Sequence, residues 1–143
     1  MKFLFVILLL VISGSTLACS CAQLSGRDVM ESGYGENVFI AFVTEAKTEP
    51  SNGKYVTVVA KFEVEKVFKT GDFIPSEVET YLDSAACGFP IEVGSRYVFV
   101  AANDGEVNYC TSRLIPEYEH DVEIDRYLKD LEANMKQLEI TKD

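Results

Sequence analysis

Residues 55–68 read YVTVVAKFEVEKVF, with apolar and polar side chains alternating along most of the stretch. Positions 56, 58, 60, 62 and 64 carry Val, Val, Ala, Phe and Val on one face. A period of two predicts a strand with one buried face. Strands typically run about five or six residues, so the length of this one predicts a bend or a β-bulge.

Four more strands are predicted around this one, at residues 38–44 (VFIAFVT), 77–82, 96–102 and 106–110. Residues 50–53 and 71–76 are turns, and Asn103-Asp104-Gly105 predicts a hairpin that pairs 106–110 with 96–102. A short helix is expected around residues 25–32. A closing helix is expected at about residues 119–138, where apolar residues recur every three or four positions: Ile124, Tyr127, Leu128, Leu131, Met135 and Leu138.

Five short strands cannot bury a core as an open sheet with two exposed edges. A partly closed barrel with a helix packed against it solves this problem, and the five-stranded Greek-key barrel is the OB-fold. The predicted fold class is therefore mainly β, a five-stranded OB-fold barrel with a C-terminal α-helix. Aromatic residues at or near strand positions are expected in the barrel core or at its rim: Tyr34, Phe39, Phe42, Phe62, Phe68, Phe89, Tyr97 and Phe99.

The first 18 residues have the pattern of a secretory signal peptide. Lys2 precedes an apolar run at residues 3–12, and Thr16 and Ala18 occupy the two positions that signal peptidase reads. We therefore expect a secreted protein with one domain at residues 19–143. A lipoprotein signal would also place Cys19 first, but it fits Thr16-Leu17-Ala18 poorly and would leave an odd number of thiols.

The mature chain is acidic, with 12 basic and 23 acidic side chains in 125 residues, a net charge of about −11. This balance argues against nucleic acid and anionic membrane surfaces as partners, because both attract Lys and Arg. No other segment is apolar enough to span a membrane. We expect a soluble monomer without a cofactor of its own.

Four cysteines remain in the mature chain, at 19, 21, 87 and 110, and they allow three pairings. A Cys19–Cys21 ring would be strained, whereas both other pairings tie the N-terminus to two distant points. Chain termini normally fray, so a cross-link at the first residue suggests a use for its amine. A neutral amine and the carbonyl oxygen of the same residue can chelate zinc. At a catalytic zinc, they would displace the water that acts as nucleophile.

The pattern resembles the N-terminal inhibitory domain of the tissue inhibitors of metalloproteinases, a family of netrin-like OB-fold modules. The matching features are the mature start Cys19-Ser20-Cys21, the stretch Ser84-Ala85-Ala86-Cys87-Gly88, Val93-Gly94 before a strand, and Cys110 followed by Ile115-Pro116. The family's domain usually has a third disulfide, for which this chain has no cysteines, and it usually has a proline soon after the second cysteine.

The resemblance implies a secreted inhibitor of zinc metalloproteinases. Cys19 would bind the zinc of the partner protease through its amine and carbonyl, and Ser20 would point toward the adjacent specificity pocket. The implied disulfides are Cys19–Cys87 and Cys21–Cys110. The implied inhibitory contact comprises eight residues: Cys19, Ser20, Cys21, Ala22, Ser84, Ala85, Ala86 and Cys87.

Three other interpretations stay open. A netrin-like module could bind an extracellular protein without inhibiting a protease, because a fold does not fix a function. An enzyme is disfavoured: His120 is the single histidine, and neither HExxH nor G-x-S-x-G occurs. Thiolates of Cys19 and Cys21 could bind a soft metal, although the secretory route favours disulfides. Residues 49–54, at the first hairpin, could also touch a partner.

Overall fold

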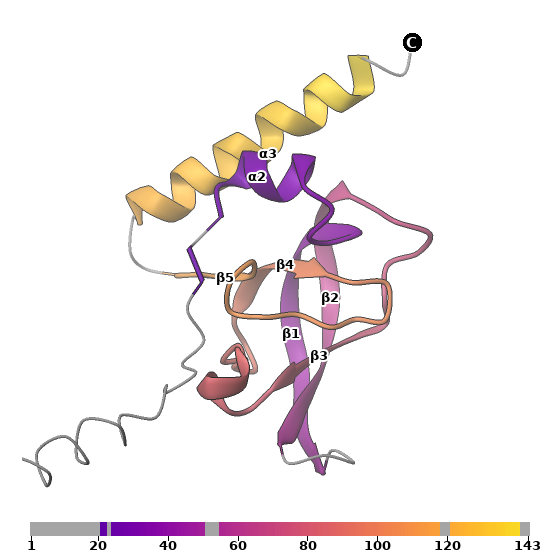
Figure 1. Cartoon of the computed structure of the whole chain (residues 1–143), viewed down its shortest axis with the longest axis vertical. Helices are drawn as coiled ribbons and strands as arrows, with labels where there is room; N and C mark the ends of the chain where they lie inside the picture. Colours follow the sequence, from indigo (N-terminus) through magenta and orange to yellow (C-terminus); the bar gives the residue numbers. More distant parts are fainter. Residues whose placement is uncertain (1–20, 23, 51–54, 118–120, 141–143) are drawn as a thin grey trace, which may run out of the picture.

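The protein consists of one antiparallel five-stranded sheet with two helices above it, in the computed structural model (Figure 1). The model describes residues 21, 22, 24–50, 55–117 and 121–140. The strand order is β3-β2-β1-β4-β5, so the mainly β prediction with a C-terminal helix is confirmed. The elements are α2 (Gly26–Glu31), β1 (Asn37–Pro50), β2 (Val56–Lys69), β3 (Glu77–Tyr81), the 3₁₀ helix η1 (Ser84–Ala86), β4 (Arg96–Ala101), β5 (Arg113–Ile115) and α3 (Val122–Ile140).

The pairing of β1 with β2 contains the irregularity that the length of β2 predicts. Its register shifts at three places, between Val38 and Phe39, between Ile40 and Ala41, and between Val43 and Glu45. Each shift inserts an unpaired residue, which bends the strands and increases their twist. One consequence concerns Phe68, which joins the cluster beneath the helices, whereas Ala60 of the same strand faces the opposite cluster.

The centre of the sheet is buried on both faces because two separate hydrophobic clusters cover it. In β4, Tyr97 and Phe99 belong to the first cluster, while Val98 and Val100 belong to the second. The first cluster is rich in aromatic rings. The second cluster contains the inner faces of α2 and α3. Successive strand residues point to opposite faces, so a continuous apolar run is what a doubly covered strand requires.

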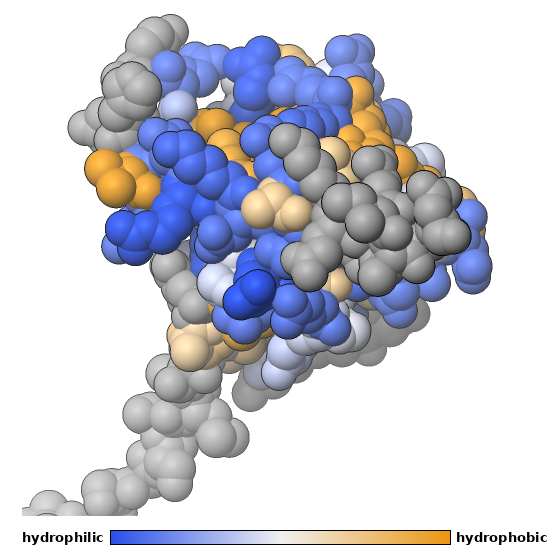
Figure 2. All heavy atoms as spheres, turned by 90° about the horizontal axis from the view of Figure 1, so that it is seen from above, coloured by the Kyte–Doolittle hydropathy of each residue, from blue (hydrophilic) through white to orange (hydrophobic). Residues whose placement is uncertain are grey.

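Helices α2 and α3 pack closely against each other above the sheet, and the described surface seen from above is mostly hydrophilic (Figure 2). Ser25 caps α2 in a capping box with Asp28, which satisfies backbone groups at the start of the helix. A Cβ atom at Gly26 would lie 2.6 Å from the carbonyl oxygen of Tyr127, so this contact requires glycine. The predicted apolar stripe of α3 is confirmed for Ile124, Tyr127 and Leu131, which are buried.

The prediction for the last strand is wrong. The segment that pairs with β4 is β5, with Arg96 opposite Ile115, and residues 106–110 do not form that strand. Instead, Glu106 makes a parallel bridge to Glu79 of β3. The backbone turns at Gly105, whose φ is +91° and whose added Cβ would lie 2.5 Å from the carbonyl oxygen of Glu77. The chain therefore leaves the turn against β3, and it reaches β4 only later.

This bridge links the β3 edge to the segment between β4 and β5, but the strands form an open sheet. Among the described residues, β3 and β5 are not paired with each other. Tyr34 is not part of the core either, because 68% of its surface is exposed. No helix in the described part of the chain is long and apolar enough to span a membrane. The predicted signal peptide at 1–18 lies outside the described residues, as do residues 51–53 of the turn predicted at 50–53, whereas Pro50 ends β1.

Candidate functional site

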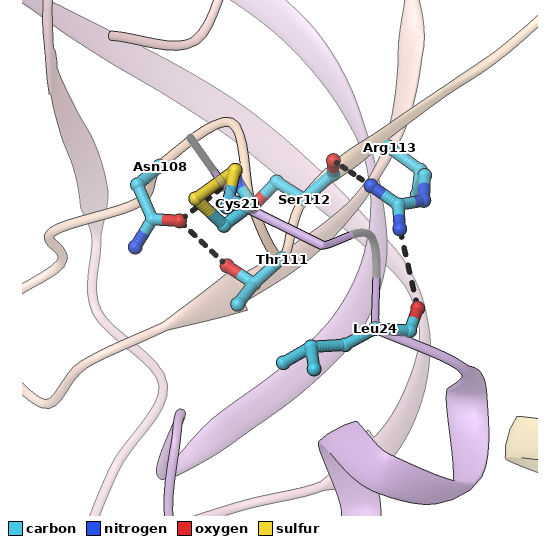
Figure 3. The surroundings of a disulfide bond; sticks show 7 residues. Cys21, Leu24, Asn108, Thr111, Ser112 and Arg113 are labelled. Atoms are coloured by element: carbon cyan, nitrogen blue, oxygen red, sulfur yellow. Dashed lines mark hydrogen bonds between the residues drawn. A yellow bond between two sulfur atoms is a disulfide. The ribbon is translucent and has the colours of Figure 1, made fainter. Parts of the chain in front are cut away.

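A disulfide fastens the N-terminal end of the described chain to the loop between β4 and β5. Cys21 is bonded to Cys110, with 5.5 Å between the Cα atoms and a sequence separation of 89 (Figure 3). This is one of the two pairs that the resemblance implies. A cross-link over so long a loop removes much conformational entropy from the unfolded chain, about 4–5 kcal/mol in the chain-entropy model. The residues just before α2 are therefore fixed to the loop that carries Cys110.

The loop at residues 108–113, which we call the anchor loop, is held by its own hydrogen bonds. The Asn108 side-chain oxygen accepts from the Cys110 backbone nitrogen at 3.0 Å and from the Thr111 hydroxyl at 3.3 Å (Figure 3). The Ser112 hydroxyl accepts from the backbone nitrogen of Val100 in β4 at 3.2 Å. Thr111 and Ser112 are both buried. The anchor loop is thus part of the rigid body of the protein.

The other predicted contact residues form a compact turn after β3, which we call the connector (residues 84–87). The Asp83 carboxylate accepts from the Ala85 backbone nitrogen at 2.8 Å and so caps η1. Cys87 ends the turn in the left-handed region, with φ 60°. Gly88 follows because the backbone passes so close to Tyr81 that an added Cβ would lie 1.9 Å from the Tyr81 carbonyl oxygen.

The connector and the anchor loop are joined directly. The backbone nitrogen of Tyr109 donates to the carbonyl oxygen of Cys87 at 3.1 Å. The adjacent residue, Cys110, holds Cys21. Cys87 is itself disulfide-bonded, and no cysteine among the described residues is free. Two segments far apart in sequence, the N-terminal end and the connector, therefore meet at one pair of neighbouring residues in the anchor loop.

A groove of about 710 Å³ runs beside the connector. Ser84 and Ala85 form part of its wall and are exposed. The remaining lining is mostly apolar: Val58, Leu82, Gly88, Phe89, Pro90, Ile91 and Tyr109. Sequence reasoning did not identify this groove. The sequence gives little indication of it. Leu82 lies in a predicted strand, and the structure shows that 62% of its surface is exposed.

Burial changes the acidity of two tyrosines near this region. Loss of hydration raises the pKa of Tyr127 to about 12, and the nearby Arg113 offsets this only in part. The Tyr127 hydroxyl donates to the carbonyl oxygen of Thr111 at 3.2 Å, which satisfies it in its neutral form. Desolvation also raises the pKa of Tyr97, whose hydroxyl oxygen accepts from the Glu92 backbone nitrogen at 2.8 Å.

The predicted site residues thus fall into two groups. Cys21, Ala22, Ser84, Ala85, Ala86 and Cys87 are described, and the anchor loop links the segments that carry them. Cys19 and Ser20 lie outside the described residues, as does His120, so the predicted Cys19–Cys87 pair does too. In the described part of the chain, His, Cys, Asp and Glu do not gather in groups of three that could hold a metal. Neither a protein-family model nor a curated protein sequence matches the chain.

Proposed function

We propose that this protein is a secreted inhibitor of zinc metalloproteinases that caps the catalytic zinc of its target with the amine and carbonyl oxygen of Cys19. The observation that carries the proposal is the junction at the anchor loop. Cys110 holds Cys21, and the neighbouring Tyr109 holds Cys87, so the N-terminal end and the connector share one support. A rigid terminus of this kind suits a task that needs the α-amine at a fixed place.

Cysteine counting supports a second anchor at the terminus itself. Once Cys21 and Cys110 are paired, Cys19 is the remaining cysteine of this chain that Cys87 can bond. That bond would clamp the first mature residue to the connector. Cys19 would then stand beside Ser84, Ala85 and Ala86, and Ser20 would be free to point toward the specificity pocket of the target.

We further propose that the sheet is the netrin-like OB-fold of the family that the sequence resembles. The three register shifts between β1 and β2 support this, because bulges let a sheet coil toward closure. The parallel bridge between Glu79 and Glu106 supports it too, since it links the β3 edge to the segment that precedes β5. A coiled sheet would present its loops, including the connector and the anchor loop, at one end.

The mechanism requires an open coordination position on the target's zinc. Three protein ligands hold a catalytic zinc, and water fills the fourth position. A free α-amine is a weak enough base that a useful fraction is neutral at pH 7, and zinc binding increases that fraction. Displacing the water removes the nucleophile for peptide hydrolysis. The protein would act on its target as a monomer and would need no metal of its own.

The test compares inhibition by the mature protein with that of a form carrying one extra alanine before Cys19. The extension moves the α-amine one residue away and leaves every described contact in place. We expect the native form to inhibit at least one zinc metalloproteinase of a small panel, and the extended form to lose that inhibition. Equal inhibition by both forms would reject the chelation mechanism.

A second comparison tests the connector. Ala85→Arg places a bulky charge on the exposed connector, whereas Ala46→Arg places the same side chain on the exposed part of β1. We expect only Ala85→Arg to weaken inhibition, with both variants unfolding at the same temperature as the native protein. If native protein inhibits no member of the panel, a netrin-like module that binds another extracellular protein becomes the better interpretation.

A further inference from the structure

Arg113 contacts both the N-terminal end of the described chain and the C-terminal helix. Its Nη2 donates to the carbonyl oxygen of Leu24 at 3.2 Å (Figure 3). Its guanidinium carbon lies 5.3 Å from the centroid of the Tyr127 ring on α3, which places a cation over an aromatic face. Its Nη1 also donates to the carbonyl oxygen of Ser112 at 3.4 Å. One planar side chain thus bridges three parts of the protein.

Cys21, Ala22 and Leu24, which we call the strap, are held at both ends by the same short stretch of chain. The disulfide to Cys110 holds one end, and Arg113 holds the other through the Leu24 carbonyl. Figure 3 shows Cys21 and Leu24 beside Thr111, Ser112 and Arg113. The position of the strap therefore depends on how firmly the stretch from Cys110 to Arg113 is itself held.

Helix α3 supports that stretch at two places, both through Tyr127. The phenol oxygen donates to the Thr111 carbonyl at 3.2 Å, and the ring lies beneath the Arg113 guanidinium. Tyr127 is 5% exposed, so its ring is fixed by the surrounding core. The Arg113 side chain is half-buried between the helix and the strap. Stacking on the Tyr127 ring restricts the plane of the Arg113 guanidinium, so its hydrogen bond to the Leu24 carbonyl has a defined geometry.

We propose that Arg113 is a positioning residue, which docks on Tyr127 of α3 and thereby fixes the strap and the N-terminus beyond it. Its effect on inhibition rests on the proposed function, whereas its effect on the strap does not. The C-terminal helix would then do more than cover the sheet, because it would set the orientation of the inhibitory end of the molecule.

Arg126 provides a matched control. Arg113 and Arg126 both line a cleft of about 360 Å³ that is bounded by Leu24 and Ser25, by β5 and by the start of α3. The Arg126 side chain is exposed and carries the same charge as Arg113. Arg113→Gln and Arg126→Gln therefore change the local charge equally, but only the first removes the bridge to Leu24. Arg113→Lys keeps the charge and loses the planar fork and the stack.

The experiment is hydrogen exchange followed by mass spectrometry on the full mature protein and these three variants. In Arg113→Gln we expect amides of the peptide covering residues 21–28 to exchange about tenfold faster, because the Ser25 and Asp28 nitrogens donate hydrogen bonds directly after the Leu24 carbonyl that Arg113 holds. The factor is the effect of losing a hydrogen bond from a charged donor. Arg113→Lys should show the same change to a smaller degree. Arg126→Gln should match the native protein, and peptides from β1 should match it in all variants.

Two results would overturn the inference: equal exchange of the strap in Arg113→Gln and Arg126→Gln, or an equal acceleration in β1, which would make Arg113 a general stabiliser. If Arg113→Gln does not fold, the same comparison is made with Arg113→Lys. The inhibition assay adds a separate readout, with about tenfold weaker inhibition expected for Arg113→Gln. If the native protein inhibits no protease of the panel, the proposed function is refuted, while the exchange data still decide the role of Arg113.

Discussion

Gly88→Ala should be one of the most damaging single-methyl changes in this protein. The added Cβ would lie 1.9 Å from the Tyr81 carbonyl oxygen, 2.7 Å from the Tyr81 carbonyl carbon and 2.8 Å from the Asp83 carbonyl oxygen. All three neighbours are backbone atoms, so no side-chain rotation can relieve the clash. The two chain segments would have to separate by about 1 Å before the closest contact became tolerable.

That separation would disturb bonds that hold the connector. The Gly88 backbone nitrogen donates to the Asp83 carbonyl oxygen at 3.1 Å, and the next nitrogen, of Phe89, donates to the Thr80 hydroxyl at 2.9 Å. Overpacking alone typically costs about 1–3 kcal/mol, and the strained hydrogen bonds add to it. We therefore expect Gly88→Ala to lower the free energy of unfolding by about 3 kcal/mol or more. For a domain of this size, this corresponds to a fall of roughly 10 °C in Tm.

The assay is urea unfolding followed by circular dichroism, with Gly33→Ala as the matched control. Gly33 has no heavy atom within 4 Å of an added Cβ, and its φ is not in the left-handed region. The same methyl group there should change the free energy of unfolding by less than about 0.5 kcal/mol. A Gly88→Ala variant as stable as Gly33→Ala would refute the close approach of the connector to β3, and with it the placement of Cys87.

Three further changes test other parts of the structure. Phe99→Ala removes a fully buried ring that lies within 6.5 Å, centroid to centroid, of Phe39, Phe62, Phe89 and Tyr97, and it should cost about 3–5 kcal/mol in urea unfolding. Thr80→Val keeps the shape but leaves the buried Phe89 nitrogen without its acceptor, so a loss of about 1–3 kcal/mol is expected by the same method. The pKa of Tyr127 is raised to about 12 from 10.0, so its contribution is complete below pH 10 and is lost as the pH rises toward 12, by roughly 3 kcal/mol in total. Unfolding measured from pH 9 to 12 should show this slope in the native protein and a shallower one in Tyr127→Phe, and identical slopes would contradict the burial of that hydroxyl.

Local patterns in the sequence were sufficient for most elements. The alternation in residues 55–68 predicted β2 and its bend, and the stripe through Ile124, Tyr127 and Leu131 predicted the buried face of α3. These predictions succeed because the period of a strand or helix is set by its own backbone geometry. The short helix expected around residues 25–32 is present as α2, and the capping box that starts it lies within four consecutive residues.

The candidate site could be predicted only in part. The resemblance placed Cys21 and the connector in one contact and implied the Cys21–Cys110 disulfide, and the structure brings these segments together at the anchor loop. The groove beside Ser84 and Ala85 was missed, because its wall combines residues from β2, the connector and the anchor loop. The bridge made by Arg113 was missed for the same reason: its two partners, Leu24 and Tyr127, lie on either side of it in sequence and far from it.

The sequence by itself determined both helices, four of the five strands and which of their faces are apolar, because these properties depend on neighbouring residues. The tertiary structure alone decided that Arg113–Ile115 pairs with β4, while Glu106 turns to the edge of β3. It also decided that Tyr109 meets Cys87 and that α3 lies beneath Arg113. Such contacts join residues far apart in the chain, and they are selected by how the whole core packs, which no local pattern records.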